Sequence, residues 1–213
     1  MTKQNYNLIF DMDGTLVDSA FVSVEACQEM ARRWGLPVRT ADEISGLVGY
    51  ADEDFYSRLY PQFSKEERLE FAAQVENMEN EAIIGMGSKL LYSGVVDLLQ
   101  ELERKGYYLA IASTRTKGHV DAALHESGIV KYFSQIRCGA PDKQDMVREL
   151  MQQGPKGQWL ILGDRHKDLE AGRANGIVTV AARYGCGNPE EYAQFDYGID
   201  QPLELLPLLD TLQ

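Results

Sequence analysis

The sequence has little that would place it in a membrane or on nucleic acid. No apolar stretch approaches the roughly 20 residues of a membrane span, and the first ten residues lack the apolar stretch of a signal peptide. Positive charge is scarce, because 21 Lys and Arg residues face 33 Asp and Glu residues, which gives a formal net charge of −12. That charge argues against binding to nucleic acid or to an anionic membrane. An anionic substrate would therefore need positive charge gathered at its own site.

Cysteine is also sparse. Cys27, Cys138 and Cys186 are odd in number, widely spaced and in no metal-ligand pattern, so we expect reduced thiols in a cytoplasmic protein. The 213 residues are nevertheless 44% hydrophobic and 25% charged, which is typical of a soluble protein with a packed core. This length fits one large domain or a domain with a sizeable insertion.

The order of helical and strand patterns predicts an α/β fold. Leu8–Phe10 is a short apolar run typical of a buried parallel strand. From about residue 17 to 84 the signals are helical, and after residue 87 helices and strands alternate. The expected helices of these two regions include 65–83, 94–105, 117–127, 143–152 and one ending near 174, and the expected strands are 108–112, one near 136, 159–162 and 177–181. This alternation predicts a doubly wound, Rossmann-like parallel sheet into which an all-helical block is inserted after the first strand.

Two acids follow the first strand in the stretch FDMDGTLVDS. Asp11 and Asp13 would point to the same face if the strand continued, and Gly14 permits a tight turn or a close backbone approach. A simple turn explains Asp-x-Asp-Gly equally well when it is taken alone. A calcium loop is excluded, because its spaced oxygen donors and closing Glu are missing. The acids stand at a strand's carboxyl end, where open α/β sheets bind ligands.

Three further polar clusters follow later strands, and each has an ordinary explanation by itself. Ser113 and Thr114 could simply cap the next helix, and Lys143 could be a solvated lysine in a first helical turn. Asp164 and Asp168 are one helical turn apart and could be surface capping acids.

Taken together, the clusters complete one charge argument. Carboxylates gathered at strand ends need a counterion, and oxygen ligands favour Mg²⁺. A phosphate on that metal needs further donors, which Ser113 at a helix start and the compact charge of Lys143 would supply. The set predicts phosphoryl transfer with a carboxylate nucleophile.

The stretches FDMDGTLVDS, IAST, Lys143 and LGDRHKDLEAG resemble the four motifs of the haloacid dehalogenase superfamily. The helical insertion is similar to the α-helical cap of that superfamily, and the order of elements resembles its phosphoglycolate-phosphatase-like branch. The resemblance covers essentially the whole chain. It implies a catalytic core over 1–16 and 87–213, a cap domain over 17–86, and an Mg²⁺-dependent phosphatase acting on a small phosphorylated metabolite.

The resemblance also implies a role for each site residue. Asp11 would attack phosphorus to form an aspartyl-phosphate, while Asp13 would protonate the leaving oxygen and then activate water. A second acid excludes the dehalogenase reaction, because displacing halide needs no proton on a leaving oxygen. The phosphoryl group would be bound by Ser113, Thr114 and Lys143. The expected Mg²⁺ ligands are the carboxylates of Asp11 and Asp164 and the backbone carbonyl of Asp13, with Asp168 as a further ligand or an acid behind the ligands.

Two alternatives to a phosphatase are a phosphomutase and a noncatalytic binding protein on the same fold. Sugar-phosphate mutases of the superfamily carry a cap histidine about ten residues past the general acid, where this chain has Ser23. All four motifs are chemically complete, which disfavours a noncatalytic protein. The chain departs from the usual motifs in having Ser113-Thr114 in place of Thr-Asn, and in having Pro141 before Lys143 rather than a proline after it.

Arg165-His166-Lys167 places three basic residues between the two acids of the fourth motif. They could simply offset acidic charge at the surface. Alternatively, Arg165 leans over the site and favours substrates with a second anionic group, because a guanidinium can bind a carboxylate or phosphate bidentately. His119 and His125 fall on a polar helical pattern and are expected to be solvated.

Overall fold

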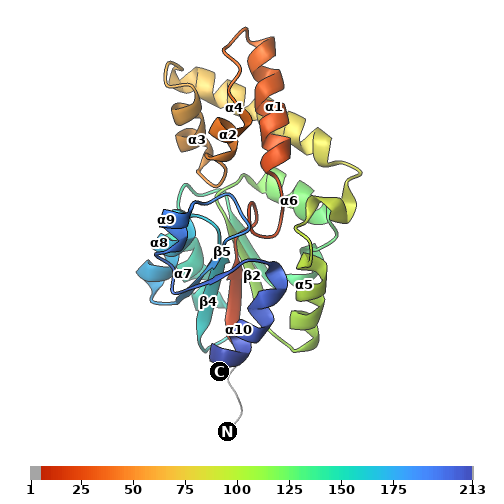
Figure 1. The fold of residues 1–213 in the computed structure, drawn as a ribbon, viewed down its shortest axis with the longest axis vertical. Coiled ribbons are helices and arrows are strands. Elements are labelled where there is room, and N and C mark those ends of the chain that lie inside the picture. Colours follow the sequence, from red (N-terminus) through yellow and green to blue (C-terminus); the bar gives the residue numbers. More distant parts are fainter. Residues whose placement is uncertain (1–5, 213) are drawn as a thin grey trace.

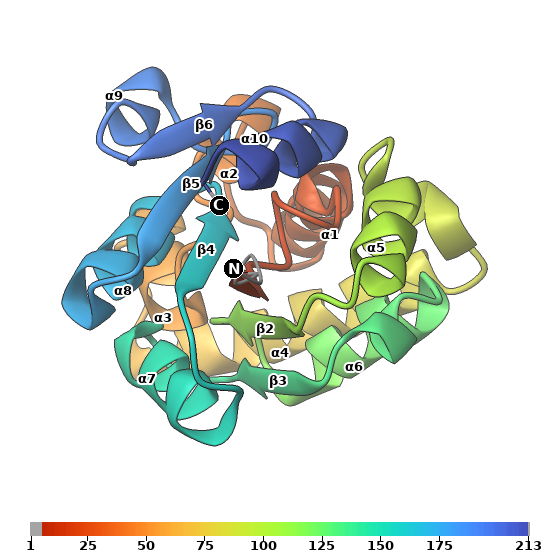
Figure 2. The same ribbon diagram turned by 90° about the horizontal axis from the view of Figure 1, so that it is seen from below.

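The computed structural model describes residues 6–212, with only the backbone of Asp52, and its core is a six-stranded sheet (Figure 1). The strands are β1 (Asn7–Phe10), β2 (Leu109–Ser113), β3 (Gln135–Cys138), β4 (Trp159–Gly163), β5 (Val178–Ala182) and β6 (Tyr197–Ile199). Their order is β3-β2-β1-β4-β5-β6, and all neighbouring pairs are parallel (Figure 2). The predicted doubly wound α/β fold is confirmed.

Helices cover both faces of this sheet. One face is covered by α5 (Val95–Arg104), α6 (Lys117–Glu126) and α10 (Leu205–Leu212), and the other by α7 (Gln144–Gln153) and α8 (His166–Asn175). Leu8 and Phe10 of β1 pack into the first layer, whereas Ile9 packs into the second. Because both faces are buried, Leu8–Phe10 of β1 form a continuous apolar run instead of an alternating pattern.

Most of the predicted elements are present with ends shifted by one or two residues. The charged helix expected over 65–83 is α4 (Lys65–Ile83), and the weak strand near residue 136 is β3. Six elements near the C-terminus or in connections were not predicted from the sequence. They are β6, α9 (Pro189–Tyr192), α10 and the 3₁₀ turns Gly87–Leu90, Val130–Tyr132 and Pro202–Glu204. Among the described helices, none is long and apolar enough to cross a membrane.

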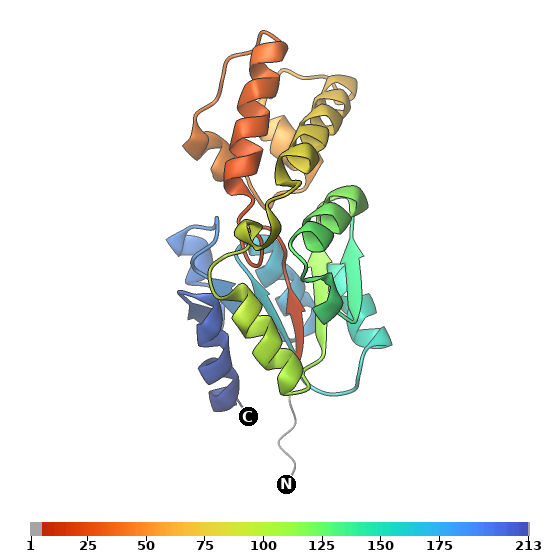
Figure 3. The ribbon, with the colours of Figure 1, turned by 90° about the vertical axis from the view of Figure 1, so that its right-hand side faces the viewer.

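Four helices form a separate layer above the carboxyl ends of the strands (Figure 3). These are α1 (Ala20–Arg33), α2 (Ala41–Ser45), α3 (Asp52–Leu59) and α4. They enclose an apolar cluster of their own, in which the rings of Trp34, Phe63 and Phe71 lie against one another. The helical segment over 17–86 is called the cap below.

Two connections between the cap and the sheet run side by side. The Asp18 N–H donates to the Leu90 carbonyl over 2.9 Å, and the Tyr92 N–H donates to the Leu16 carbonyl over 3.1 Å. The chain therefore leaves the sheet layer and returns to it at one place, directly after the Asp-Met-Asp-Gly stretch.

Candidate active site

Acidic side chains from neighbouring strands meet at the edge of the sheet that faces the cap. Asp11 follows β1 and Asp164 follows β4, two strands paired in parallel, while Asp168 lies in the first turn of α8. Carboxylate oxygens of the three acids lie within 4.8 Å of one another, and all three side chains are buried. In this strand order β1 lies at the topological switch point, where open α/β sheets bind ligands.

Gly14 allows the chain to turn closely against Asp164. Its φ is +76°, and a Cβ at this position would lie 2.2 Å from Oδ2 of Asp164. A side chain would therefore displace the acid as well as strain the backbone. The close backbone approach expected from the sequence is present, and it explains the glycine that follows the two acids.

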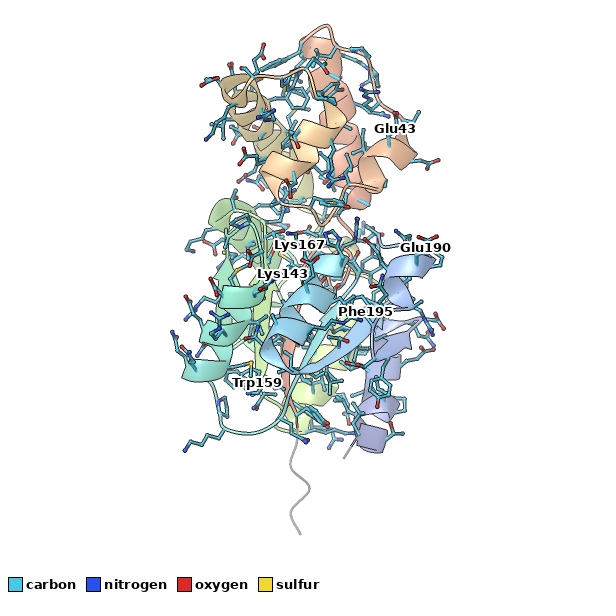
Figure 4. The ribbon with its side chains drawn as sticks, turned by 90° about the vertical axis from the view of Figure 1, so that its left-hand side faces the viewer. Glu43, Lys143, Trp159, Lys167, Glu190 and Phe195 are labelled. Carbon is cyan, nitrogen blue, oxygen red and sulfur yellow. The ribbon has the colours of Figure 1, made fainter. Side chains whose placement is uncertain are left out.

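Lys143 is buried between two of the acids and is not solvated. Its Nζ lies 2.6 Å from Oδ1 of Asp11 and 2.7 Å from Oδ1 of Asp168. Figure 4 shows Lys143 at the end of the core nearest the cap, with Trp159 at the opposite end. Burial alone lowers the pKa of a lysine, but the two carboxylates reverse this and hold the pKa of Lys143 above its usual value. The lysine therefore stays charged and offsets part of the repulsion between the acids.

One lysine leaves the acid cluster with excess negative charge. Burial and the neighbouring Asp168 raise the pKa of Asp11 well above its usual value, in spite of Lys143. Burial and Asp168 likewise raise the pKa of Asp164 to about 7. Ionised carboxylates in this position require an additional cation.

The acid cluster fits a hard divalent cation such as Mg²⁺. Oδ2 of Asp164 accepts a hydrogen bond from the Cys186 N–H over 2.7 Å, whereas its buried Oδ1 has no hydrogen-bond partner among residues 6–212. Asp168 is less available, because its Oδ1 pairs with Lys143 and its Oδ2 accepts from the Arg165 N–H over 3.2 Å. An unpartnered buried carboxylate oxygen beside a second acid is the donor arrangement that a metal ion would satisfy.

Asp13 has different neighbours from those of Asp11. Its Oδ1 lies 3.7 Å from Nε2 of His119. Burial raises the pKa of Asp13, but His119, Arg115 and Ser19 outweigh this and lower the pKa to about 2. The two acids of one short stretch therefore have pKa values shifted in opposite directions, because their charged neighbours differ.

His119 is the main site residue that the sequence interpretation missed. The expectation that it is solvated is wrong, because its side chain is buried in the first turn of α6 and faces Asp13 and α4. His125, near the other end of α6, is exposed as expected. Its position in the sequence could have indicated this burial. His119 follows Ser113 by six residues and lies in the first turn of the helix after β2, which places it near the carboxyl ends of the strands.

Ser113 and Thr114 are buried at the end of β2 and do not cap the next helix. That cap is Thr116, whose hydroxyl accepts from the His119 N–H over 3.3 Å. Oγ of Ser113 accepts from the Arg115 N–H over 3.2 Å. The structure therefore excludes helix capping as the role of Ser113 and Thr114.

Arg165 extends into the cap and is not a surface charge. Its Nη1 donates to the carbonyl of Gly46 over 3.2 Å and to that of Val48, and its guanidinium carbon lies 4.8 Å from the centre of the Tyr50 ring. Gly49 has a φ of +92°, and a Cβ there would lie 2.5 Å from Cγ of Arg165. The surface-charge interpretation is wrong for Arg165, while its predicted contact with substrate stays a prediction.

The segment after β5 closes one side of the site. Besides the Cys186 N–H on Asp164, the Tyr184 hydroxyl donates to the Thr15 carbonyl over 3.0 Å. From the sequence alone, Arg183-Tyr184-Gly185 could equally be a functional loop or a simple turn. The Cys186 N–H holds the carboxylate of Asp164, and the Tyr184 hydroxyl holds the chain after Gly14. The segment after β5 therefore orients both parts of the site.

Comparison with known proteins agrees with this arrangement. Residues 8–182 match the model of the haloacid dehalogenase-like hydrolase family. The chain is 26% identical to an N-acetylmuramic acid 6-phosphate phosphatase from Pseudomonas putida, over 96% of each protein, and 28% identical to a phosphoglycolate phosphatase from Vibrio vulnificus, over 98% of each. A solved structure of a haloacid dehalogenase-like family hydrolase from Streptococcus pneumoniae superposes with a TM-score of 0.83 at 27% identity, covering 98% of this chain and 99% of that one. The chain belongs to the haloacid dehalogenase-like hydrolase family.

Proposed function

We propose that the protein is an Mg²⁺-dependent phosphatase that hydrolyses a small phosphorylated metabolite through an aspartyl-phosphate intermediate. The observation that carries this proposal is the buried contact of Lys143 with both Asp11 and Asp168, beside the partly unpaired carboxylate of Asp164. The relatives named above support the reaction class. Their names give two different phosphate esters, so they do not select one substrate for this chain.

Asp11 serves as the nucleophile. Its Oδ1 accepts from the Met12 N–H over 2.7 Å and pairs with Lys143, which fixes the orientation of the carboxylate. Oδ2 then attacks phosphorus, and the new bond forms as the bond from phosphorus to the leaving oxygen breaks. Lys143 is close enough to this carboxylate to bind the transferred phosphoryl group, together with the hydroxyls of Ser113 and Thr114.

Asp11 and Asp164, with the backbone carbonyl of Asp13, would hold Mg²⁺. When bound, this ion would neutralise the carboxylates and polarise the phosphoryl oxygens. Asp168 holds Lys143, and because both of its oxygens already have partners it would serve as an acid behind the metal ligands. These assignments account for each buried acid at the edge of the sheet.

Asp13 gives a proton to the leaving oxygen and later takes one from the attacking water. Its lowered pKa keeps it ionised in the ligand-free site. A bound phosphoryl group adds negative charge beside it and raises the pKa again, so the acid takes up its proton as substrate binds. General acid–base help of this kind contributes roughly 10²–10⁴-fold.

The cap over 17–86 acts as one domain above a catalytic core formed by 1–16 and 87–213. Its layer lies over the carboxyl ends of the strands, where it excludes water from the acids (Figure 3). Side chains from the cap then contact the part of the substrate that leaves.

Phosphate release from a panel of phosphorylated sugars, acids and nucleotides tests the proposal. We expect release with Mg²⁺, none in chelator, and poor replacement by Ca²⁺, whose larger and looser coordination shell would misplace the attacking oxygen. Asp11→Asn should abolish turnover without changing the circular dichroism spectrum, and near-normal activity of this variant would remove Asp11 as the nucleophile. Phosphate moved within a substrate would indicate a phosphomutase. Retained metal binding without turnover of any ester would indicate a noncatalytic protein.

A further inference from the structure

A buried polar cluster joins the cap to Asp13. Its members come from four separate segments and are Ser23 of α1, Glu79 and Asn80 of α4, Arg115 after β2, and His119 of α6. Glu79 is 1% exposed and His119 is 2% exposed. Buried charges and rings of this kind are costly unless their partners are fixed, so the arrangement needs an explanation.

The imidazole of His119 has one edge toward the cap and the other toward the catalytic acid. Its Nδ1 lies 3.0 Å from Oδ1 of Asn80 and 3.9 Å from Oε2 of Glu79. Its Nε2 lies 3.7 Å from Oδ1 of Asp13. The ring is therefore the direct link between helix α4 and Asp13.

Glu79 is held from both the cap and the core. The Ser23 hydroxyl donates to Oε1 over 2.5 Å, and Nη2 of Arg115 donates to Oε2. The second contact crosses from the core to the cap, so it exists only while α4 is docked against the strand ends. Docking of α4 consequently brings Glu79 and Asn80 to the ring of His119 together.

Asp13 and His119 face each other with hydrogen-bonding atoms that have no other partner among the residues that the structure describes. Neither carboxylate oxygen of Asp13 nor Nε2 of His119 has a hydrogen-bond partner within the described part of the chain. Two unpaired buried groups that face each other at 3.7 Å need to move only slightly to form a hydrogen bond. Asn80 limits this movement, because it holds the opposite edge of the ring.

We infer that His119 is a positioning residue for Asp13, and that Asn80 and Glu79 of the cap orient its ring so that the acid is aligned when the cap is docked. This inference rests on the proposed phosphatase activity and on Asp13 as its proton-transfer group. His119 carries the inference, because its ring connects helix α4 of the cap to Asp13. A misplacement of about 1 Å of a reacting group can cost about 10²-fold in rate, so such alignment is large enough to measure.

Two substrates with different leaving groups test it. An alkyl phosphomonoester needs a proton on its leaving oxygen, whereas p-nitrophenyl phosphate releases a stable aryloxide without one. We expect His119→Leu to lower kcat/KM by about 10- to 100-fold for the alkyl ester and by less than about 3-fold for the aryl ester. His119→Gln, which keeps a donor facing Asp13, should recover part of the loss, and Asn80→Ala should reproduce the same selectivity more weakly.

His125→Leu is the matched control, because His125 lies exposed on the same helix and should change neither rate. Equal losses on both esters in the His119 variants, or no loss on either, would overturn the inference. If circular dichroism shows that His119→Leu does not fold, the comparison of the two esters is made with Asn80→Ala instead. The alkyl ester is the panel compound that the wild-type protein hydrolyses fastest. A wild-type protein inactive on p-nitrophenyl phosphate and on every ester of the panel would instead overturn the phosphatase proposal and this inference with it.

Discussion

Gly49 of the cap and Arg165 of the core interlock. The Cβ that Gly49 lacks would lie 2.5 Å from Cγ of Arg165, and the guanidinium beyond it reaches the carbonyls of Gly46 and Val48. Arg165 directly follows Asp164, so this contact joins the loop between α2 and α3 to the residue next to the acid cluster. The position of the loop between α2 and α3 is therefore coupled to the acid cluster through the side chain of Arg165.

Gly49→Ala should weaken the docking of the cap. The added methyl group would meet Arg165, and the φ of +92° would be strained as well. We expect kcat/KM to fall by about 10- to 100-fold. Gly35→Ala is the control, because Gly35 also lies in the cap with a φ of +64° but has no heavy atom within 4 Å of its missing Cβ. Equal losses in both variants would assign the effect to backbone strain alone.

Arg165→Ala should lower kcat/KM to a similar extent for singly and doubly anionic phosphate esters. Its Nη1 is bound by cap carbonyls, so its removal should loosen cap docking whatever the substrate carries. Steady-state kinetics on a matched pair of esters, one with an additional carboxylate, gives the measurement. A loss confined to the doubly anionic ester would support direct binding of a second anionic group by Arg165.

Lys143→Met should remove activity and destabilise the protein. It would leave Asp11 and Asp168 buried without their cation, and breaking a buried ion pair from one side costs about 3–5 kcal/mol. Denaturant unfolding in chelator measures this loss. Adding Asp168→Leu should restore part of the stability but not the turnover. A single variant as stable as the wild type would contradict the ion pairs described for Lys143.

Stability without metal should decrease as the pH rises from about 4 to about 7. Asp164 has a pKa raised from 3.8 to about 7 in the folded protein, so in this range the folded state binds a proton that the unfolded state has released. Asp13, whose pKa is lowered to about 2, acts in the opposite sense and only below about pH 4.

The melting temperature in chelator at pH 5 and pH 7.5 measures this effect. We expect the higher value at pH 5, a smaller difference in Asp164→Asn, and a gain on adding Mg²⁺ at pH 7.5, where the ion can bind the ionised acids. A melting temperature that rises between the two pH values in chelator would contradict the raised pKa of Asp164.

The sheet and its acids could be predicted from the sequence because their signals are local. Leu8–Phe10 is apolar on both faces, and Asp11, Asp13 and Gly14 follow it without interruption. The same holds for β4 and Asp164. The three residues of β6 are too few to give a periodic pattern, and the prediction missed them for that reason.

The contacts with the cap could not be predicted, because they join distant segments. His119 has a polar helical pattern around it, and only the docking of α4 buries it against Asn80. Arg165 stands among other basic residues between Asp164 and Asp168 in the sequence, and only the loop containing Val48 provides its carbonyl partners. A histidine and an arginine of ordinary appearance thus gain their roles from packing between two parts of the chain.

The adjacent connections at Leu16–Asp18 and Leu90–Tyr92 have an evolutionary consequence. Because the two ends of the inserted segment are hydrogen-bonded to each other, a short loop could replace that segment without opening the sheet. Insertions of different length and shape could therefore be exchanged at this point while the strand order and the acids stay in place. Selection can then alter which molecules enter the site independently of the residues that carry out the reaction.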